Sequence, residues 1–425
     1  MTTAIDPPIT PERLSRLAAL ANDDGETRVN SRDWTGSITF EIQGEEHRLQ
    51  VRSGVFTPMD ADAAGLAGTH VVARGTAEHW AKVLLRVPPP GFTDVFGGAF
   101  LGMTVEPAHL SADLHLAVRR LVELLRHLVN GTDPAPQPDT ARRPHGTLDA
   151  AVGRYIHLDI DGRDHRLYFE EAGSGIGLLC QHTAGADARQ WRHLLEDERI
   201  TSRFRVIAYD LPYHGRSLPP TGVAWWAEEY RLTRDHLMQI PIRLAEALGV
   251  ERPVFIGSSV GGMLALDLAR FHPDRFRSVI SCEGALHLGP EGPEERNATG
   301  DDPAEHAAAM MSWMGATAPE ALRQETRLHY AQGAPGVFAG DIAYFSGDHD
   351  LRGQAHLIDT ARCPVHMLTG DYDFVTVPAS ERAAAAIPGV TLTLMPGLGH
   401  FPMSEDPERF AEYLMPVLDR AAACP

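Results

Sequence analysis

The feature that most constrains this chain is a glycine-rich turn between an apolar run and an amphipathic stretch. The letters GSSVGG occupy residues 257–262, after the apolar residues 253–256 and before a helix pattern that runs to His272. A strand–turn–helix of this kind holds its central serine in strained backbone and needs small neighbours, so that adjacent backbone packs closely. The serine hydroxyl then stands above the sheet, near the N–H groups of a helix start. We therefore expect Ser259 to be a nucleophile and Ser258 to be a small residue that fits the turn.

The C-terminal two thirds of the chain alternate strand-like runs with amphipathic helix patterns. The strand-like runs are residues 155–160, 165–170, 177–181, 205–209, 254–257, 278–282, 365–369 and 391–395. Several of them are continuously apolar, which is typical of strands that helices bury on both faces. We therefore expect an α/β architecture with a mostly parallel sheet.

A serine hydroxyl becomes nucleophilic only beside a base, and the candidate here is His400. It follows the strand-like run 390–395, on the loop PGLGHFP at residues 396–402. Most of the 21 histidines lie among charged residues, as solvated side chains do. His400 differs because a glycine precedes it and Phe–Pro follows it, which indicates a shaped loop at a sheet edge.

The base in turn needs an acid that fixes its tautomer and stabilises the imidazolium. The letters GDYD, residues 370–373, end the strand-like run 365–369. We favour Asp373 as this acid. Asp371 is an alternative that is better suited to turning the chain, and Glu283, directly after the strand-like run 278–282, is a second alternative.

The chain order serine, aspartate, histidine is the order of the α/β-hydrolase superfamily. The C-terminal 275 residues resemble this superfamily along their full length. Two further segments match it: HTAG at residues 182–185 is similar to the family's His-Gly-x oxyanion loop, and DLPYHGRS at residues 210–217 is similar to its Asp-x-x-x-x-Gly-x-Ser signature. The resemblance implies a cofactor-independent enzyme without a metal.

By this resemblance the backbone N–H groups of Val260 and Ala184 form the oxyanion hole, each donor contributing about 3–4 kcal/mol to catalysis. Thr183 departs from the family, which often has glycine there. Its side chain is either a steric adjustment or an added donor. For His182 the alternative to a role in substrate binding is a structural one, in which it anchors the loop.

More than eighty residues separate Cys282 from the strand-like run 365–369, and the family often inserts a helical lid at this place. We expect a lid over about residues 284–360, with a polar lead at 289–302 and helices at 303–313 and 319–331. Methionines cluster in the first helix, a pattern that is more typical of a core than of a pocket. The candidate pocket residues are His182, Thr183, Trp313, Tyr330 and Tyr344, with His349 as a further candidate contact.

The N-terminal part reads as a separate domain. A segment with four prolines and no apolar periodicity, GTDPAPQPDTARRPHG, predicts a linker within residues 131–150, so the domains are 1–130 and 151–425. The order of a small sheet and a terminal amphipathic helix makes residues 30–130 resemble the sterol-carrier-protein fold, which implies a small α+β domain with an apolar groove. The favoured alternative is a domain that packs on the enzyme or on a second copy and binds no ligand.

Composition excludes several other classes of function. The formal net charge of −19 argues against nucleic acids and polyanionic substrates. Lys82 is the only lysine, so a Schiff-base enzyme is not expected. The four cysteines are scattered without metal-site spacing, which fits a reducing, cytoplasmic compartment. We expect no signal peptide and no membrane span, because the start lacks a basic and apolar pattern and no run of 18 apolar residues occurs.

These observations favour a serine hydrolase that cleaves carboxylic esters of small or medium apolar substrates through an acyl-enzyme. An alternative with the same triad is a carbon–carbon bond hydrolase of diketo-acid ring-cleavage products. An alternative of another class is a non-catalytic protein that binds apolar ligands, and the three intact triad positions argue against it. The sequence leaves a homodimer open.

Overall fold

A computed structural model describes residues 9–59, 67–288 and 302–424, and these residues group into two compact units. The first unit holds the described residues up to 137 together with residues 304–317. The second holds residues 138–288, 302–303 and 318–424. The division falls within the proline-rich segment, in which residues 132–149 form no helix or strand.

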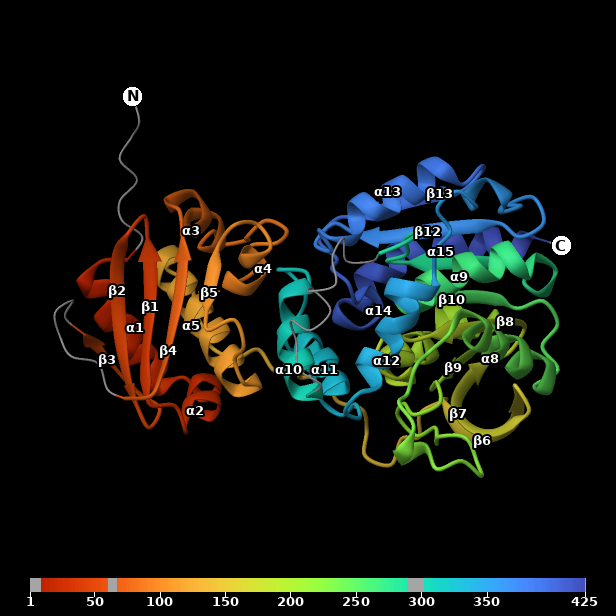
Figure 1. Cartoon of the computed structure of the whole chain (residues 1–425), viewed down its shortest axis with the longest axis horizontal. Coiled ribbons are helices and arrows are strands. Elements are labelled where there is room, and N and C mark those ends of the chain that lie inside the picture. The colour runs from red at the N-terminus through yellow and green to blue at the C-terminus, as the bar shows by residue number, and fades with distance from the viewer. Residues whose placement is uncertain (1–8, 60–66, 289–301, 425) are drawn as a thin grey trace. The chain divides into compact units, whose positions relative to one another are not determined.

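The second unit is built on a sheet of eight strands, counted over the described residues (Figure 1). Its spatial order is β13-β12-β11-β10-β8-β9-β7-β6. The pairs from β13 to β9 are parallel, and β7 and β6 add two antiparallel pairs at one edge. The strands are β6 Val152–Ile160, β7 Arg163–Gly173, β8 Ile176–Gln181, β9 Phe204–Tyr209, β10 Val254–Ser258, β11 Ser278–Cys282, β12 Val365–Gly370 and β13 Thr391–Met395.

Each of the eight strand-like runs in the sequence lies inside one of these strands, so the predicted α/β class with a mostly parallel sheet is confirmed. The inner strands β10, β11 and β12 are buried along their whole length, and β8 is buried from Gly177 onward, as continuous apolar runs require. The helices of the second unit that pack against the sheet or its connections are α6 Arg192–Glu196, α7 Glu198–Thr201, α8 Arg234–Ala247, α9 Val260–Phe271, α13 Thr376–Ala386, α14 Pro402–Glu405 and α15 Pro407–Ala423.

The long connection between β11 and β12 contains helices, as expected for a lid, but these divide between the two units. Helices α11 Glu320–Ala331 and α12 Val337–Ala343 belong to the second unit. Helix α10 Pro303–Met310 groups with the first unit from residue 304 onward, together with the turn Met311–Trp313. Most of the predicted polar lead, residues 289–301, lies outside the described residues.

The first unit has a five-stranded sheet in the order β3-β2-β1-β4-β5, again for the described residues. β1 and β4 are parallel and the other pairs are antiparallel. Its strands are β1 Gly36–Ile42, β2 Glu45–Arg52, β3 Val55–Met59, β4 Thr69–Gly75 and β5 Thr104–Glu106, and its helices besides α10 are α1 Pro11–Asp23, α2 Gly25–Ser31, α3 Ala77–Val83, α4 Val95–Ala99 and α5 Ala112–Asn130.

Helix α5 shows how the sequence defines one of these elements. The Ser111 hydroxyl accepts the Leu114 N–H at its start, and Gly131 ends it in the left-handed region with φ 62°. Between these caps, leucine and valine recur on one face and enter the core of the unit. The resemblance of residues 30–130 to the sterol-carrier fold stays a prediction.

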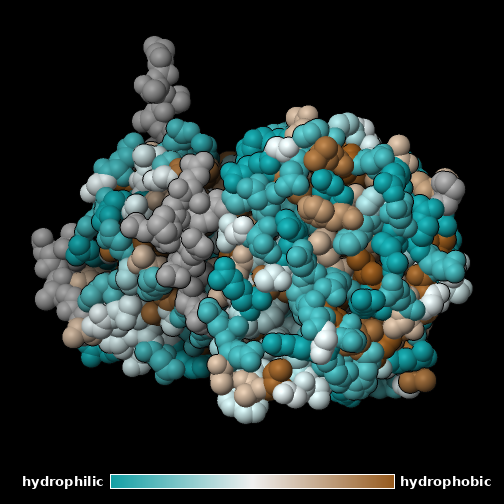
Figure 2. Space-filling view, turned by 45° about the vertical axis from the view of Figure 1, so that its right-hand side comes forward, coloured by the Kyte–Doolittle hydropathy of each residue, from teal (hydrophilic) through white to brown (hydrophobic). Residues whose placement is uncertain are grey.

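Hydrophilic residues cover most of the face shown in Figure 2, where the hydrophobic residues form small separate groups. No helix within the described ranges is long and apolar enough to cross a bilayer.

Candidate active site

Ser259 occupies the sharp turn between β10 and α9, as its sequence context predicts. Its backbone lies at φ 57° and ψ −113°, outside the regions that non-glycine residues usually adopt. The Ser259 N–H donates to the Cys282 carbonyl at 2.9 Å, which ties this turn to the end of β11. Strain held by the surrounding structure in this way is typical of functional positions.

The glycines of the turn are required by close backbone contacts. A Cβ atom on Gly257 would lie 2.3 Å from the Gly261 carbonyl oxygen, and one on Gly262 would lie 2.1 Å from the Cys282 carbonyl oxygen. A Cβ atom on Gly261 would lie 2.8 Å from both the carbonyl oxygen and the Cγ atom of Gln181. Any side chain at these positions would push α9 away from the strands and displace Ser259.

His400 and Asp373 form the second part of the site. The Nδ1 atom of His400 lies 2.6 Å from Oδ2 of Asp373, and Oδ1 of Asp373 accepts the Thr376 N–H at 3.3 Å. Burial alone would raise the pKa of Asp373. The charge and hydrogen bond of His400, together with the hydrogen bond of Thr376, lower this pKa by more than burial raises it. The net pKa lies below its usual value, so Asp373 is an anion that accepts from the imidazole.

The two alternative acids have other partners. Oδ1 of Asp371 accepts the Gly397 N–H at 2.6 Å and shapes the loop before His400. Oε1 of Glu283 accepts the Gly370 N–H at 3.0 Å, and its side chain is fully buried. Burial, and next the neighbouring Asp373 carboxylate, raise the pKa of Glu283 well above its usual value. Burial and the neighbouring carboxylate therefore favour the neutral form of Glu283.

The side chain of His182 fixes the conformation of the loop after β8. Nδ1 of His182 lies 2.7 Å from the Thr183 carbonyl oxygen, and Nε2 accepts the Leu211 N–H at 3.1 Å. These partners require a neutral ring with its proton on Nδ1. Burial, and next the nearby His214, lower the pKa of His182 to about 4.

The N–H groups of this loop are not equivalent. The Thr183 N–H donates to Oε1 of Gln190 at 3.0 Å and is therefore occupied. Within the part of the chain that the structure describes, the N–H groups of Ala184 and Val260 have no protein acceptor. They are the two donors that the sequence predicts for an oxyanion hole.

The sequence profile described as "Alpha/beta hydrolase family" matches residues 178–413, which is more than half of the chain. The chain belongs to the alpha/beta hydrolase family.

Several proteins and solved structures are similar to this alpha/beta hydrolase. The Caulobacter sp. (strain K31) protein named "Putative carbamate hydrolase RutD" is 27% identical over 286 residues, which are 62% of this chain and 98% of that protein. A thermophilic esterase from Thermogutta terrifontis has a TM-score of 0.54 at 23% identity, over 64% of this chain and 100% of its own. A hydrolase from Pseudomonas aeruginosa PA01 has a TM-score of 0.53 at 26% identity, over 62% of this chain and 98% of its own. The Caulobacter and Pseudomonas proteins support a hydrolase, and the Thermogutta structure supports the fold.

The candidate pocket residues of this alpha/beta hydrolase lie in different parts of the structure. The Tyr330 hydroxyl contacts the Thr183 hydroxyl, and its ring lies 5.4 Å from that of Phe401, next to His400.

The Tyr344 hydroxyl donates to Oδ2 of Asp267 at 2.8 Å in the core. Trp313 belongs to the first unit, where its ring lies 5.7 Å from that of Phe100. His349 is fully buried, with Nδ1 2.9 Å from Oδ2 of Asp267 and Nε2 2.8 Å from the carbonyl oxygen of Ala285.

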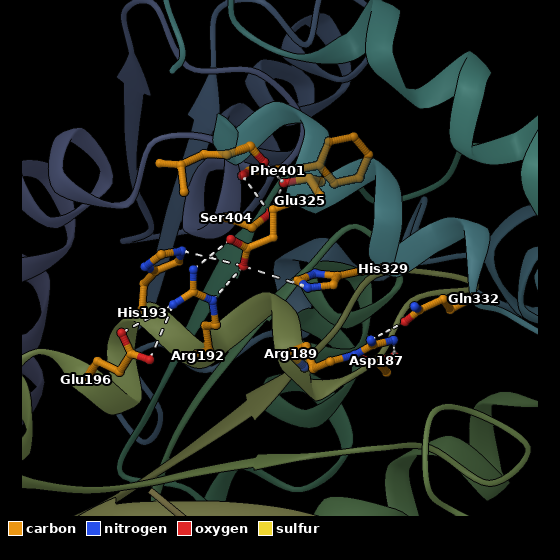
Figure 3. Close-up of polar contacts among 12 residues, drawn as sticks. Asp187, Arg189, Arg192, His193, Glu196, Glu325, His329, Gln332, Phe401 and Ser404 are labelled. Atoms are coloured by element: carbon orange, nitrogen blue, oxygen red, sulfur yellow. Dashed lines mark hydrogen bonds and ion pairs between the residues drawn. The ribbon is translucent and has the colours of Figure 1, made fainter. Parts of the chain in front are cut away.

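A charged cluster attaches α11 to the segment that follows the β8 loop (Figure 3). Nε and Nη2 of Arg192 lie 2.5 Å and 2.6 Å from the two carboxylate oxygens of Glu325. The Thr326 hydroxyl donates to the Ser404 hydroxyl at 2.9 Å, which links α11 to α14 directly after the His400 loop. Helix α11 therefore supports both loops of the site.

The family signature at residues 210–217 also has a structural role. Oδ1 of Asp210 accepts the Ala188 N–H at 2.8 Å, and Oδ2 accepts the Arg216 N–H at 2.6 Å. The Ser217 hydroxyl donates to the Asp210 carbonyl at 2.8 Å. These bonds close the loop after β9 and hold it against the β8 loop.

Three supporting residues were not predicted from the sequence. Glu405 accepts the Phe401 N–H at 3.3 Å and also the Gly399 N–H, and so bonds both neighbours of His400. Gln190 holds Thr183, and Asp341 of α12 accepts the Gly185 N–H at 2.8 Å. Glu405, five residues after His400, carried a weak local signal, whereas Asp341 carried none because 156 positions separate it from Gly185.

Proposed function

We propose that this alpha/beta hydrolase is a cofactor-independent serine hydrolase that cleaves carboxylic esters of small or medium apolar substrates. The observation that carries the proposal is the combination of a strained Ser259 at the start of α9 with the His400–Asp373 contact of 2.6 Å. These are the elements of nucleophile, base and orienting acid.

In the proposed first step the Ser259 hydroxyl oxygen attacks the ester carbonyl carbon while Nε2 of His400 accepts the hydroxyl proton. Negative charge moves to the carbonyl oxygen, where the N–H groups of Ala184 and Val260 receive it. Asp373 keeps the other imidazole proton on Nδ1 and stabilises the imidazolium.

The tetrahedral intermediate then collapses, the bond to the alkoxide breaks, and His400 gives its proton to the departing oxygen. Water attacks the resulting acyl-enzyme with His400 again as base. The second collapse restores the Ser259 hydroxyl and releases the acid. The reaction consumes one water per ester.

Two observations support the choice of substrate class. The net charge of −19 disfavours polyanionic substrates. Next to the candidate donors lie two buried aromatic side chains, Tyr330 and Phe401, whose rings are 5.4 Å apart.

Intact-mass spectrometry after treatment with a fluorophosphonate tests the proposal. The wild type should gain one adduct, Ser259→Ala should gain none, and the matched control Ser258→Ala should still be labelled. A wild type without an adduct would reject the serine hydrolase and favour the binding protein. An ester panel that includes vinylogous diketo acids then separates ester from carbon–carbon cleavage.

For the first unit we propose a packing role, with the enzyme or a second copy as partner, in place of a ligand of its own. Native mass spectrometry of the full chain tests this role. Retained fatty acid or sterol would contradict it and support the sterol-carrier resemblance. The same spectra report whether the chain is a homodimer.

A further inference from the structure

The peptide group that carries the Ala184 N–H is held in place by a contact to its carbonyl oxygen. That peptide joins Thr183 to Ala184, and its Thr183 oxygen lies 2.7 Å from Nδ1 of His182. In a trans peptide the C=O and N–H bonds point in opposite directions, so this contact directs the Ala184 N–H away from His182. The preceding peptide is held as well, because the Thr183 N–H donates to Gln190 at 3.0 Å.

The following peptide is held from a distant segment. Its Gly185 N–H donates to Oδ2 of Asp341, in helix α12, at 2.8 Å. On the other side of Ala184, the Tyr330 hydroxyl of α11 contacts Thr183. Both flanks of the candidate donor are therefore bonded by side chains from the connection between β11 and β12.

The Asp341 carboxylate is fully buried and receives three donors. Besides Gly185, Oδ2 contacts Nε2 of His214 at 2.8 Å, and Oδ1 accepts the Tyr230 hydroxyl at 2.8 Å. Nδ1 of His214 lies 2.9 Å from the Pro212 carbonyl oxygen, so both ring nitrogens face acceptors and the ring is an imidazolium. Burial alone would lower the pKa of His214. Asp341 raises this pKa by more than burial lowers it, so the net pKa is above its usual value.

Two glycines allow α12 to approach this closely. Gly185 has φ 66°, and a Cβ atom there would lie 2.9 Å from the Phe338 ring. A Cβ atom on Gly340 would lie 2.2 Å from the Tyr230 ring. The helix and the loop thus form a close-packed contact in which Asp341 is the central polar group.

We propose that Asp341 is a positioning residue for the oxyanion hole. It fixes the peptide between Ala184 and Gly185, and with it the backbone angle that aims the Ala184 N–H. It does not touch the substrate, and the inference rests on the proposed serine hydrolase. A donor displaced by a fraction of an ångström from the developing oxyanion loses much of its effect on the transition state.

The test is a comparison of Asp341→Ala with Asp341→Asn in the full chain. The alanine variant removes the acceptor of the Gly185 N–H, and kcat should fall about 10- to 100-fold with KM within about threefold. This is less than the roughly 10²- to 10³-fold fall on loss of an oxyanion donor, because the Ala184 N–H is displaced and not removed. The Ki of a trifluoromethyl ketone, which mimics the tetrahedral adduct, should rise by the same factor as kcat/KM falls. Asparagine keeps an acceptor oxygen and should restore most of the activity.

Tyr230→Phe is the matched control, because it removes one Asp341 partner and leaves the Gly185 contact in place. It should keep wild-type kcat. If Asp341→Ala does not fold, the pair His214→Asn and His214→Asn/Asp341→Ala gives the same comparison without an uncompensated imidazolium.

Two outcomes would overturn the inference: a folded alanine variant with kcat/KM near that of the wild type, or a loss confined to KM with unchanged ketone inhibition. Fluorophosphonate labelling separates this failure from that of the proposed function. A labelled wild type with a fully active Asp341→Ala rejects only the positioning role, whereas an unlabelled wild type rejects the serine hydrolase itself.

Discussion

Nδ1 of His400 lies 2.6 Å from Oδ2 of Asp373, although 27 positions separate the two residues in the sequence. The contact joins the loop after β13 to the end of β12, two neighbouring parallel strands. Carboxyl ends of parallel strands meet at one edge of the sheet, so this arrangement follows from the topology. It fixes the proton on Nδ1 and leaves Nε2 as the basic nitrogen.

Asp373→Asn should therefore lower kcat by about 10³- to 10⁴-fold, because an amide in this place favours the wrong imidazole tautomer. Steady-state hydrolysis of an activated ester measures the effect. The matched control is Asp371→Asn, which keeps an acceptor for the Gly397 N–H and should lose little activity. Equal losses in the two variants would show that the loop, and not the triad, was disturbed.

The residues that we propose for the triad could be selected from the sequence because their signals are local. The glycines at 257, 261 and 262 surround Ser259 within one turn, and backbone contacts explain why no side chain fits at any of them. The apolar runs that became β10 and β12 placed Ser259 and Asp373 at the same sheet edge. A short segment of sequence contains everything that each of these predictions needs.

The supporting contacts were not predictable, because their partners are distant and chemically ordinary. Asp341 lies in a short helix with no motif, and only the fold brings it to Gly185. The sequence likewise presents residues 284–360 as one lid. The grouping of residues 304–317 with the first unit depends on side chains more than 200 positions away.

Glu283 gives a prediction about stability and pH. Its pKa is raised in the folded state by burial and by Asp373, so the folded chain keeps a proton that the unfolded chain releases above about pH 4.5. The free energy of unfolding contributed by this group therefore falls as pH rises. Glu283→Gln mimics the neutral acid and should be more stable than the wild type at pH 8, with a smaller difference at pH 5, in urea unfolding. A gain that does not change with pH would mean that Glu283 is ionised in the fold.

For His182 we expect the opposite pH dependence, in which its contribution to the free energy of unfolding falls as pH falls. Its folded pKa of about 4 is below the unfolded value of 6.5, so the unfolded state takes up the proton first as pH falls. The wild type should lose up to about 3 kcal/mol of stability through this ring between pH 6.5 and 4, at 1.36 kcal/mol per pKa unit. His182→Gln removes this pH-dependent contribution. The amount by which the variant is less stable than the wild type should therefore shrink from pH 7.5 toward pH 4.5. A constant deficit would contradict the neutral tautomer.

Ser312 connects the far end of α10 to the first unit and allows a test of that grouping. Its hydroxyl lies 2.9 Å from both carboxylate oxygens of Asp94, and its carbonyl accepts the Thr93 hydroxyl at 2.9 Å. Asp94 also caps α4 through the Phe96 and Gly97 N–H groups.

Ser312→Ala leaves the buried Asp94 carboxylate without one of its donors, which costs about 1–3 kcal/mol. Hydrogen exchange of the full chain should therefore speed up in residues 303–313 and in α4, while β10 and β12 of the second unit keep their protection. Ser346→Ala is the control, because that hydroxyl donates only within its own helical segment. Faster exchange in β10 and unchanged exchange in α4 would show that residues 304–317 depend on the second unit instead.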